Sequence, residues 1–156
     1  MQAPPASPGL EVPLRFLLGI AGAVAATLAM DVVMARRPEG ETPPSVASGV
    51  LTDRHPDRAP DRLATVVHYL AGGLSGGLFV WLVYASEGLL GVGTIATVAA
   101  AVVMYVLMVG FFVVVVLPRS RLPRQRLPDV RRDWAVSAAT YVLVITVVVA
   151  LGSTVI

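Results

Sequence analysis

The chain has 156 residues, of which 56% are hydrophobic and 14% are charged, and its formal net charge is +2. Soluble domains carry about 25% charged residues, so this composition fits a chain that is surrounded mostly by lipid. Cysteine is absent and only two histidines are present, which excludes disulfides, thiolate metal ligands and cysteine nucleophiles. We therefore expect a small integral membrane protein with no metal site and no other cofactor.

The N-terminal part divides into a tail and a first membrane span. Residues 1–13 contain four prolines and no periodic apolar pattern, and we interpret them as a disordered tail. Residues 14–35 are apolar over about 22 positions, which is enough to cross ~30 Å of hydrocarbon. Arg36 and Arg37 then end the span. Residues 14–156 are predicted to form one all-α domain, a bundle of four transmembrane helices.

A polar loop over residues 36–62 follows the first span. Thr42 and Pro43 are suited to begin a short surface helix that reaches about Leu51, because proline fits the first helical turn. The loop then repeats an Asp-Arg pair, with a proline every fourth residue that forbids a continuous helix. We interpret this repeat as a solvated spacer, and a specific docking motif is the alternative.

The second span is predicted over residues 63–86 and is rich in glycine. Two overlapping Gly-x-x-x-Gly motifs are formed by Gly72, Gly73, Gly76 and Gly77. Lipid keeps such a segment helical, because the backbone has no other hydrogen-bonding partner there, and the glycines then become a packing surface. Residues 87–91 make a short turn to the next span, and we expect Glu87 in this turn to be exposed to solvent.

Two further spans are predicted over residues 92–117 and 134–154. The first of them stops at Pro118, and its bulky, valine-rich second half suggests contact with lipid. The loop between the two spans is strongly basic, and anionic lipid headgroups rather than nucleic acid are the expected partner of its arginines. These candidate headgroup ligands are Arg119, Arg121, Arg124, Arg126, Arg131 and Arg132.

The distribution of arginine predicts the orientation in the membrane. The loops over residues 36–62 and 118–133 hold five and six arginines, whereas the opposite side holds only Arg15. Cytoplasmic loops of membrane proteins are enriched in Lys and Arg. We therefore predict a multi-pass protein of the cell membrane with both long loops in the cytoplasm and both termini outside.

Small residues on the first two spans predict which helices pack together. Residues four apart stack on one helical face, as do those at positions 19, 23, 27 and 31, and again at 68, 72 and 76. We expect these faces to meet, because small residues allow close helix approach in lipid. A homodimer through the glycine face is the alternative. The packing residues on the first span are Gly19, Gly22, Ala23 and Thr27.

The same packing would bring together two polar residues, Asp31 and His68, at a similar depth near the arginine-rich side. Ionisable residues inside membranes are costly and tend to face protein or water. Such a pair could relay protons, bind a cation, or simply fix the packing. Alternatively, Asp31 lies among headgroups beside Arg36 or Arg37, and His68 is an interfacial donor. Side chains that could reach the same place are Tyr69, Tyr105, Ser137 and Tyr141.

Hydrolase, metalloprotease and nucleotide-binding motifs are not found in the sequence, and we expect no enzymatic activity. The sequence predicts a structural or interaction module that has a membrane-protein partner or forms a homo-oligomer. A small transporter or channel subunit that uses Asp31 and His68 is the alternative.

A family resemblance rests on three patterns within residues 16–85. They are the small residues between Gly19 and Met30, the loop segment Pro43-Pro44-x-Val46-Ala47, and His68-x-x-x-Gly72-x-x-x-Gly76. In these features the chain resembles small four-helix membrane proteins of the YagU type. The resemblance implies four membrane helices and a role for His68, and it brings no catalytic residues, because the biochemical role of that type is largely undefined.

Overall fold

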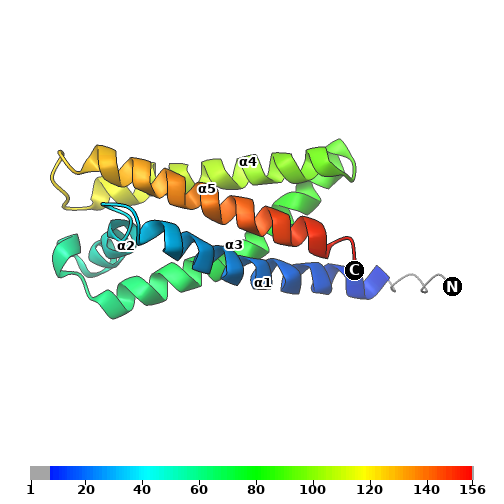
Figure 1. Ribbon diagram of the computed structural model, residues 1–156, viewed down its shortest axis with the longest axis horizontal. Coiled ribbons are helices and arrows are strands. Elements are labelled where there is room, and N and C mark those ends of the chain that lie inside the picture. Colours follow the sequence, from blue (N-terminus) through cyan, green and yellow to red (C-terminus); the bar gives the residue numbers. More distant parts are fainter. Residues whose placement is uncertain (1–7, 156) are drawn as a thin grey trace.

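The computed structural model describes residues 8–155, and every regular element within them is helical. Four long helices lie side by side as a bundle (Figure 1). They are α1 (Pro8–Met34), α3 (Asp61–Leu90), α4 (Thr94–Phe111) and α5 (Leu127–Gly152). Each is long and apolar enough to cross a membrane, when α4 is counted with its continuation to Arg119. The prediction of an all-helical chain with four membrane-length helices is therefore confirmed.

The helices extend beyond the predicted spans at several ends. α1 begins at Pro8, so the part of the predicted disordered tail that the structure describes is helical, and the remainder, residues 1–7, lies outside the described residues. α5 begins at Leu127, seven positions before the predicted start, with Pro128 in its first turn. Hydropathy marks only the apolar part of a helix, and proline is compatible with the first turn. Each of the two helices carries one acidic residue in its first turn, Glu11 in α1 and Asp129 in α5.

The connection between α3 and α4 is shorter than predicted. α3 continues through Glu87 to Leu90, which leaves a turn at Gly91–Gly93. The φ of Gly91 is +83°, a value that favours glycine because a side chain there would be strained. Glu87 accordingly belongs to a helix and not to a solvated turn.

Glu87 forms an ion pair at this end of the bundle, which corrects the prediction that it is exposed. Arg15 of α1 lies 3.1 Å from its carboxylate, and the two side chains are only 15% and 13% exposed. The guanidinium of Arg15 also lies 5.2 Å from the ring centroid of Tyr84. This cluster joins the beginning of α1 to the end of α3.

The predicted third span changes its helical geometry near its end. α4 is followed by a π-helical segment, η2 (Phe112–Val116), and then by a 3-10 turn, η3 (Leu117–Arg119), which contains Pro118. Val114 is 70% exposed and Phe111 is 62% exposed. The valine-rich half of this span thus presents large apolar side chains at the surface, as a lipid-facing helix does.

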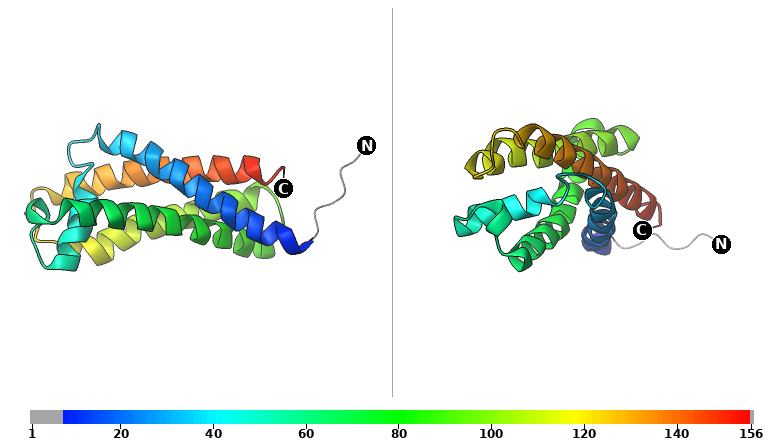
Figure 2. Two further views of the ribbon diagram at one scale, coloured as in Figure 1. Left: turned by 90° about the horizontal axis from the view of Figure 1, so that it is seen from below. Right: turned by 60° about the vertical axis from the view of Figure 1, so that its left-hand side comes forward.

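α2 (Thr42–Thr52) is the short helix that was predicted after Thr42, and it is packed against the bundle. It lies at the end opposite to the first residues of α1 and the last residues of α5, and Figure 2 shows it between α3 and the α4–α5 side. Val46 and Ser48 are fully buried, and the Ser48 hydroxyl donates to the carbonyl of Pro60 at 3.0 Å. We call this end of the molecule the loop end.

α1 packs between α3 and α5, and small side chains make both contacts possible. Ala23 and Ala26 are fully buried in a core that also holds Phe79 of α3, Met104 of α4 and Tyr141 of α5. A second apolar cluster lies at the loop end and includes Val46, Phe112, Leu122 and Val130. At this end α2 packs against α3, η2 and α5.

Candidate functional site: an Asp–His–Tyr cluster between α1 and α3

The backbones of α1 and α3 approach closely at Gly76. A methyl group at this position would lie 2.7 Å from the Cβ of Ala23 and would also collide with the carbonyl oxygen of Gly19. A methyl group at Gly72 would collide with Thr27. Glycine is required here because the neighbouring atoms include backbone, which cannot rotate away. The structure thus brings together the two small-residue faces on which the sequence prediction rested.

Three other glycines that were predicted to pack, Gly22, Gly73 and Gly77, lie outside the contact at Gly76. Gly22 faces α5, where a methyl group would lie 3.1 Å from Val148. A methyl group at Gly73 would have no neighbouring atom within 4 Å, and one at Gly77 would reach only Phe16, at 3.9 Å. Only one of the two overlapping Gly-x-x-x-Gly motifs is therefore used in packing α3 against α1.

Asp31 and His68 meet one helical turn from this contact. His68 Nε2 lies 2.7 Å from Asp31 Oδ1, and the Tyr69 hydroxyl donates to Oδ2 of the same carboxylate at 2.5 Å. The His68 side chain is 11% exposed and that of Asp31 is 33% exposed. An ionised carboxylate can only accept, so when Asp31 is ionised the hydrogen of this pair lies on Nε2 of His68. We call these three residues the Asp31 cluster.

Tyr69 belongs to this cluster although the residue is 44% exposed. It follows His68 directly, so its side chain points about 100° away around the helix. The two aromatic rings nevertheless lie edge to face with centroids 5.3 Å apart, and both polar tips reach Asp31. One α1 carboxylate thus accepts hydrogen bonds from two consecutive α3 residues, an arrangement that fixes the relative rotation of the two helices.

His68 also lines an apolar cavity of about 220 Å³ between the helices at the loop end. Its walls come from all five helices and include Pro43 of α2, Ala71 of α3, Phe112 after α4 and Trp134 of α5. The hydroxyl of Tyr141, another lining residue, donates to the carbonyl of Gly72 at 2.6 Å. We call this space the α2 cavity. The Asp31 cluster is therefore adjacent to an apolar space and not to a polar channel.

Charged residues of the two loops form a network at the loop end that sequence reasoning missed. The Arg126 guanidinium donates to both Glu39 carboxylate oxygens at 2.8 Å and to Asp57 at 3.1 Å. The guanidinium holds the pKa of Glu39 below its usual range, and the carboxylates raise the pKa of Arg126. Asp57 belongs to the Asp-Arg repeat, so this part of the predicted spacer is anchored.

Asp133 at the beginning of α5 is the most buried charged residue of this network. Its side chain is 0% exposed, and its Oδ2 accepts a hydrogen bond from the backbone N–H of Glu39 at 3.0 Å. Its Oδ1 lies 3.3 Å from Arg132 Nε and 3.8 Å from Arg37. The sequence did contain a signal for this buried carboxylate, because Asp133 directly follows two arginines at the border of an apolar span.

The six arginines predicted to bind headgroups therefore differ in their surroundings. Arg126 is engaged by Glu39 and Asp57, Arg121 by Asp53, and Arg132 by Asp129 and Asp133. Arg119 donates to the carbonyl of Val115, one turn earlier on the same segment. Arg119, Arg124 and Arg131 are exposed. These last three are the members of the set that are best placed to meet a membrane surface.

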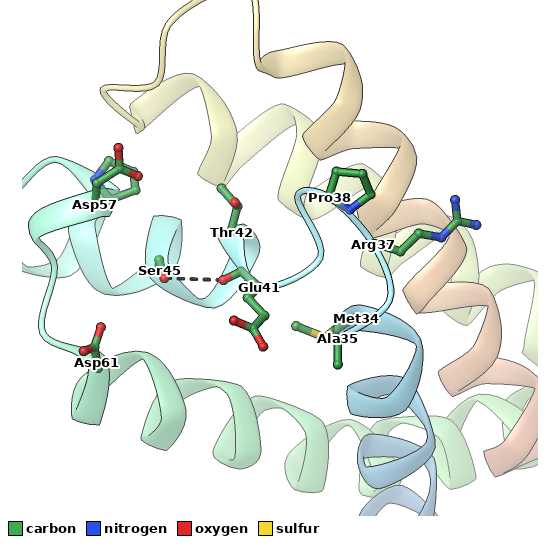
Figure 3. A pocket seen from close by; sticks show the side chains of 10 residues that line it. Met34, Ala35, Arg37, Pro38, Glu41, Thr42, Ser45, Asp57 and Asp61 are labelled. Carbon is green, nitrogen blue, oxygen red and sulfur yellow. Dashed lines mark hydrogen bonds between the residues drawn. The ribbon is translucent and has the colours of Figure 1, made fainter.

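A polar pocket of about 350 Å³ lies between the end of α1, α2 and the beginning of α3. Figure 3 shows Glu41 and Asp61 on two of its walls, with Asp57 and Arg37 nearby. Within residues 8–155, no group of three or more acidic or histidine side chains is arranged to hold a metal ion. The pocket is open and mixed in charge, so it does not define a ligand.

The pH dependence of stability tests the loop network. Glu39→Gln is expected to be less stable than the wild type at pH 7. Because the pKa of Glu39 is lower in the folded state, the stabilisation is complete above its ordinary value of 4.5 and is lost as the pH falls through the folded pKa. Thermal unfolding in detergent at pH 7 and pH 3 measures this. A difference between the two proteins that persists unchanged at pH 3 would contradict the ionic role of Glu39.

The comparisons with known proteins identify no relative of this chain. The chain has no significant match among protein-family models, curated proteins or solved structures.

Proposed function

We propose that this chain is a non-enzymatic, multi-pass protein of the cell membrane that acts as an interaction module for another transmembrane helix. The observation that carries the proposal is the second glycine motif of α3. Gly72 and Gly76 pack against α1, whereas a methyl group at Gly73 would have no neighbour within 4 Å and one at Gly77 would reach only Phe16. Small residues at four-residue spacing are the surfaces on which transmembrane helices associate.

The partner helix comes from a second copy of this chain or from another membrane protein. A second copy requires no other protein, because the α3 faces that carry Gly73 and Gly77 in two chains would complement each other across a two-fold axis. The resemblance to proteins of the YagU type is compatible with this proposal and adds no substrate to it.

Cysteine crosslinking in native membranes tests the proposal. Gly73→Cys is expected to give a covalent dimer on oxidation, because two such faces would bring the thiols together. Leu74→Cys is the matched control, since Leu74 is 76% exposed and is the next residue around the same helix. Dimer formation from Gly73→Cys that is no greater than from Leu74→Cys would rule out the second copy as the partner.

Proton transport by the Asp31 cluster is the second candidate. It is favoured by the 33% exposure of the Asp31 side chain and by its 2.7 Å contact with His68, because histidine is a common proton carrier. In liposomes that contain a pH-sensitive dye, we expect the wild type and Asp31→Asn to show the same proton leak. A wild-type flux that Asp31→Asn abolishes, and that the loop control Asp53→Asn retains, would instead favour transport.

Orientation in the membrane is proposed from the arginine distribution. Reporter fusions at Ser45 and Gln125 are expected to report the cytoplasm, and a fusion after Ile156 is expected to report the opposite side. The beginning of α1 and the end of α5 lie at the same end of the bundle, so one reporter fixes both (Figure 1). A cytoplasmic signal from the C-terminal fusion would reverse the proposed orientation.

A further inference from the structure

The α2 cavity is lined mostly by apolar side chains. We propose that it binds one acyl chain of a membrane phospholipid, which enters sideways between α3 and α4. The cavity of about 220 Å³ is larger than the ~150 Å³ apolar cavity that is sufficient to bind benzene. Protein interiors are otherwise close-packed, so a space of this size within a small bundle requires an occupant or a cost in stability.

Four of the five polar side chains in the wall, all but that of Ser75, are paired within the protein, which argues for a mostly apolar occupant. The Tyr141 hydroxyl donates to Gly72, and Trp134 Nε1 donates to the carbonyl of Met108 at 3.3 Å. His68 Nε2 is engaged by Asp31, and Thr27 donates to the carbonyl of Ala23. The surface that remains is mostly hydrocarbon, and water gains little from entering such a space.

The cavity opens towards lipid and not only towards the loops. Its lining includes Phe111, which is 62% exposed, and Ala71, which is also exposed, on the neighbouring helices α4 and α3. Ala71 lies about 15 Å along α3 from Asp61, so the opening is at the depth of acyl chains. A lipid tail in the surrounding leaflet can therefore enter without crossing a polar barrier.

The wall on the side of α4 includes the π-helical segment η2. Phe112 and Val116, at its two ends, both line the cavity, and π-helical turns are frequent at functional sites. Arg119 follows Val116 by three residues and is exposed, with its guanidinium on the carbonyl of Val115. This positive charge, about one turn beyond the cavity-lining Val116, matches the anionic headgroup of a phospholipid whose chain occupies the cavity.

Tryptophan quenching by brominated lipid tests the proposal on the full chain. Trp134 lines the cavity, and Trp81, the only other tryptophan, is 58% exposed on α3 and can be removed as Trp81→Phe. In micelles, phosphatidylglycerol with brominated acyl chains is expected to quench Trp134 saturably, at one lipid per chain. Unbrominated lipid should reverse the quenching. Quenching that rises without saturation and is not reversed would show only annular lipid and would overturn the proposal.

Variants that fill the cavity provide the second measurement. Ala71→Phe and Ala47→Leu, each in the Trp81→Phe background, are expected to abolish saturable quenching. Ala85→Phe is the matched control, because Ala85 is exposed on the same helix and does not line the cavity. Folded filling variants that still show saturable quenching would contradict the site. Replacing the phospholipid with brominated free fatty acid separates the two sources of an acyl chain, and saturable quenching by the fatty acid alone would contradict a phospholipid occupant.

Discussion

Gly76→Leu is expected to separate α1 from α3 and to lower the free energy of unfolding by about 3 kcal/mol or more. Inserting bulk into a well-packed contact costs about 1 to 3 kcal/mol, and the cost is higher where the neighbours cannot move. Here the neighbours are the carbonyl of Gly19 and the Cβ of Ala23, both fixed to the α1 backbone. Unfolding followed in detergent micelles, by heat or by a mild denaturant, measures the change.

Gly110→Leu is the matched control for this substitution. Gly110 lies within α4, and a methyl group there would have no neighbour within 4 Å. We expect it to leave stability unchanged or to raise it slightly, since leucine is the better helix former. Equal losses from Gly76→Leu and Gly110→Leu would mean that the α1–α3 contact is not the origin of the effect.

Asp133→Ala is expected to destabilise the protein by about 3 kcal/mol, because it removes a fully buried carboxylate from its partners. The N–H of Glu39 would lose its acceptor, and an unpaired, partly buried donor costs about 1 to 3 kcal/mol by itself. Arg37 and Arg132 would also lose a nearby negative charge. The same unfolding experiment measures the effect.

Asp129→Ala provides the comparison on the same helix. Asp129 pairs with Arg132 at 3.4 Å, but its side chain is 55% exposed and that of Arg132 is 59% exposed. Exposed ion pairs contribute little, so a change within about 0.5 kcal/mol is expected. If Asp133→Ala were as mild as Asp129→Ala, the buried carboxylate would not be stabilising the loop end.

Periodicity in the sequence predicted the contact between α1 and α3 and the neighbourhood of Asp31 and His68. Both predictions use a regular geometry, because residues four apart share a face and antiparallel helices bring equal depths together. In the structure, Gly76 lies against Ala23, and His68 Nε2 is 2.7 Å from Asp31. Repeating small residues and helical rise therefore carry enough information for this part of the site.

Other features of the site could not be predicted, because they depend on side-chain conformations and tertiary packing rather than on the periodicity of the sequence. Tyr69 joins the Asp31 cluster only because the side-chain rotamers of His68 and Tyr69 both direct their polar tips to Asp31. Adjacent residues of a helix do not normally share a partner. Four of the first seven residues of α5 are charged, so hydropathy placed the start of that helix at Trp134 and missed the helical position of Asp133. The α2 cavity is lined by residues from α1 to α5 and from η2, a meeting of distant segments that no local pattern of residues reveals.

The ion pairs at the loop end also have a consequence for biosynthesis. Glu39 and Asp57 lie in the loop that precedes α3, and their common partner, Arg126, comes 87 and 69 residues later. The acceptor of the Glu39 N–H, Asp133, comes 94 residues later. When the ribosome has delivered only the first two spans, this loop has neither its cation nor its acceptor. Its final conformation is therefore set only after the last pair of helices has been inserted, so a nascent chain stalled before Arg126 should expose the loop to proteases.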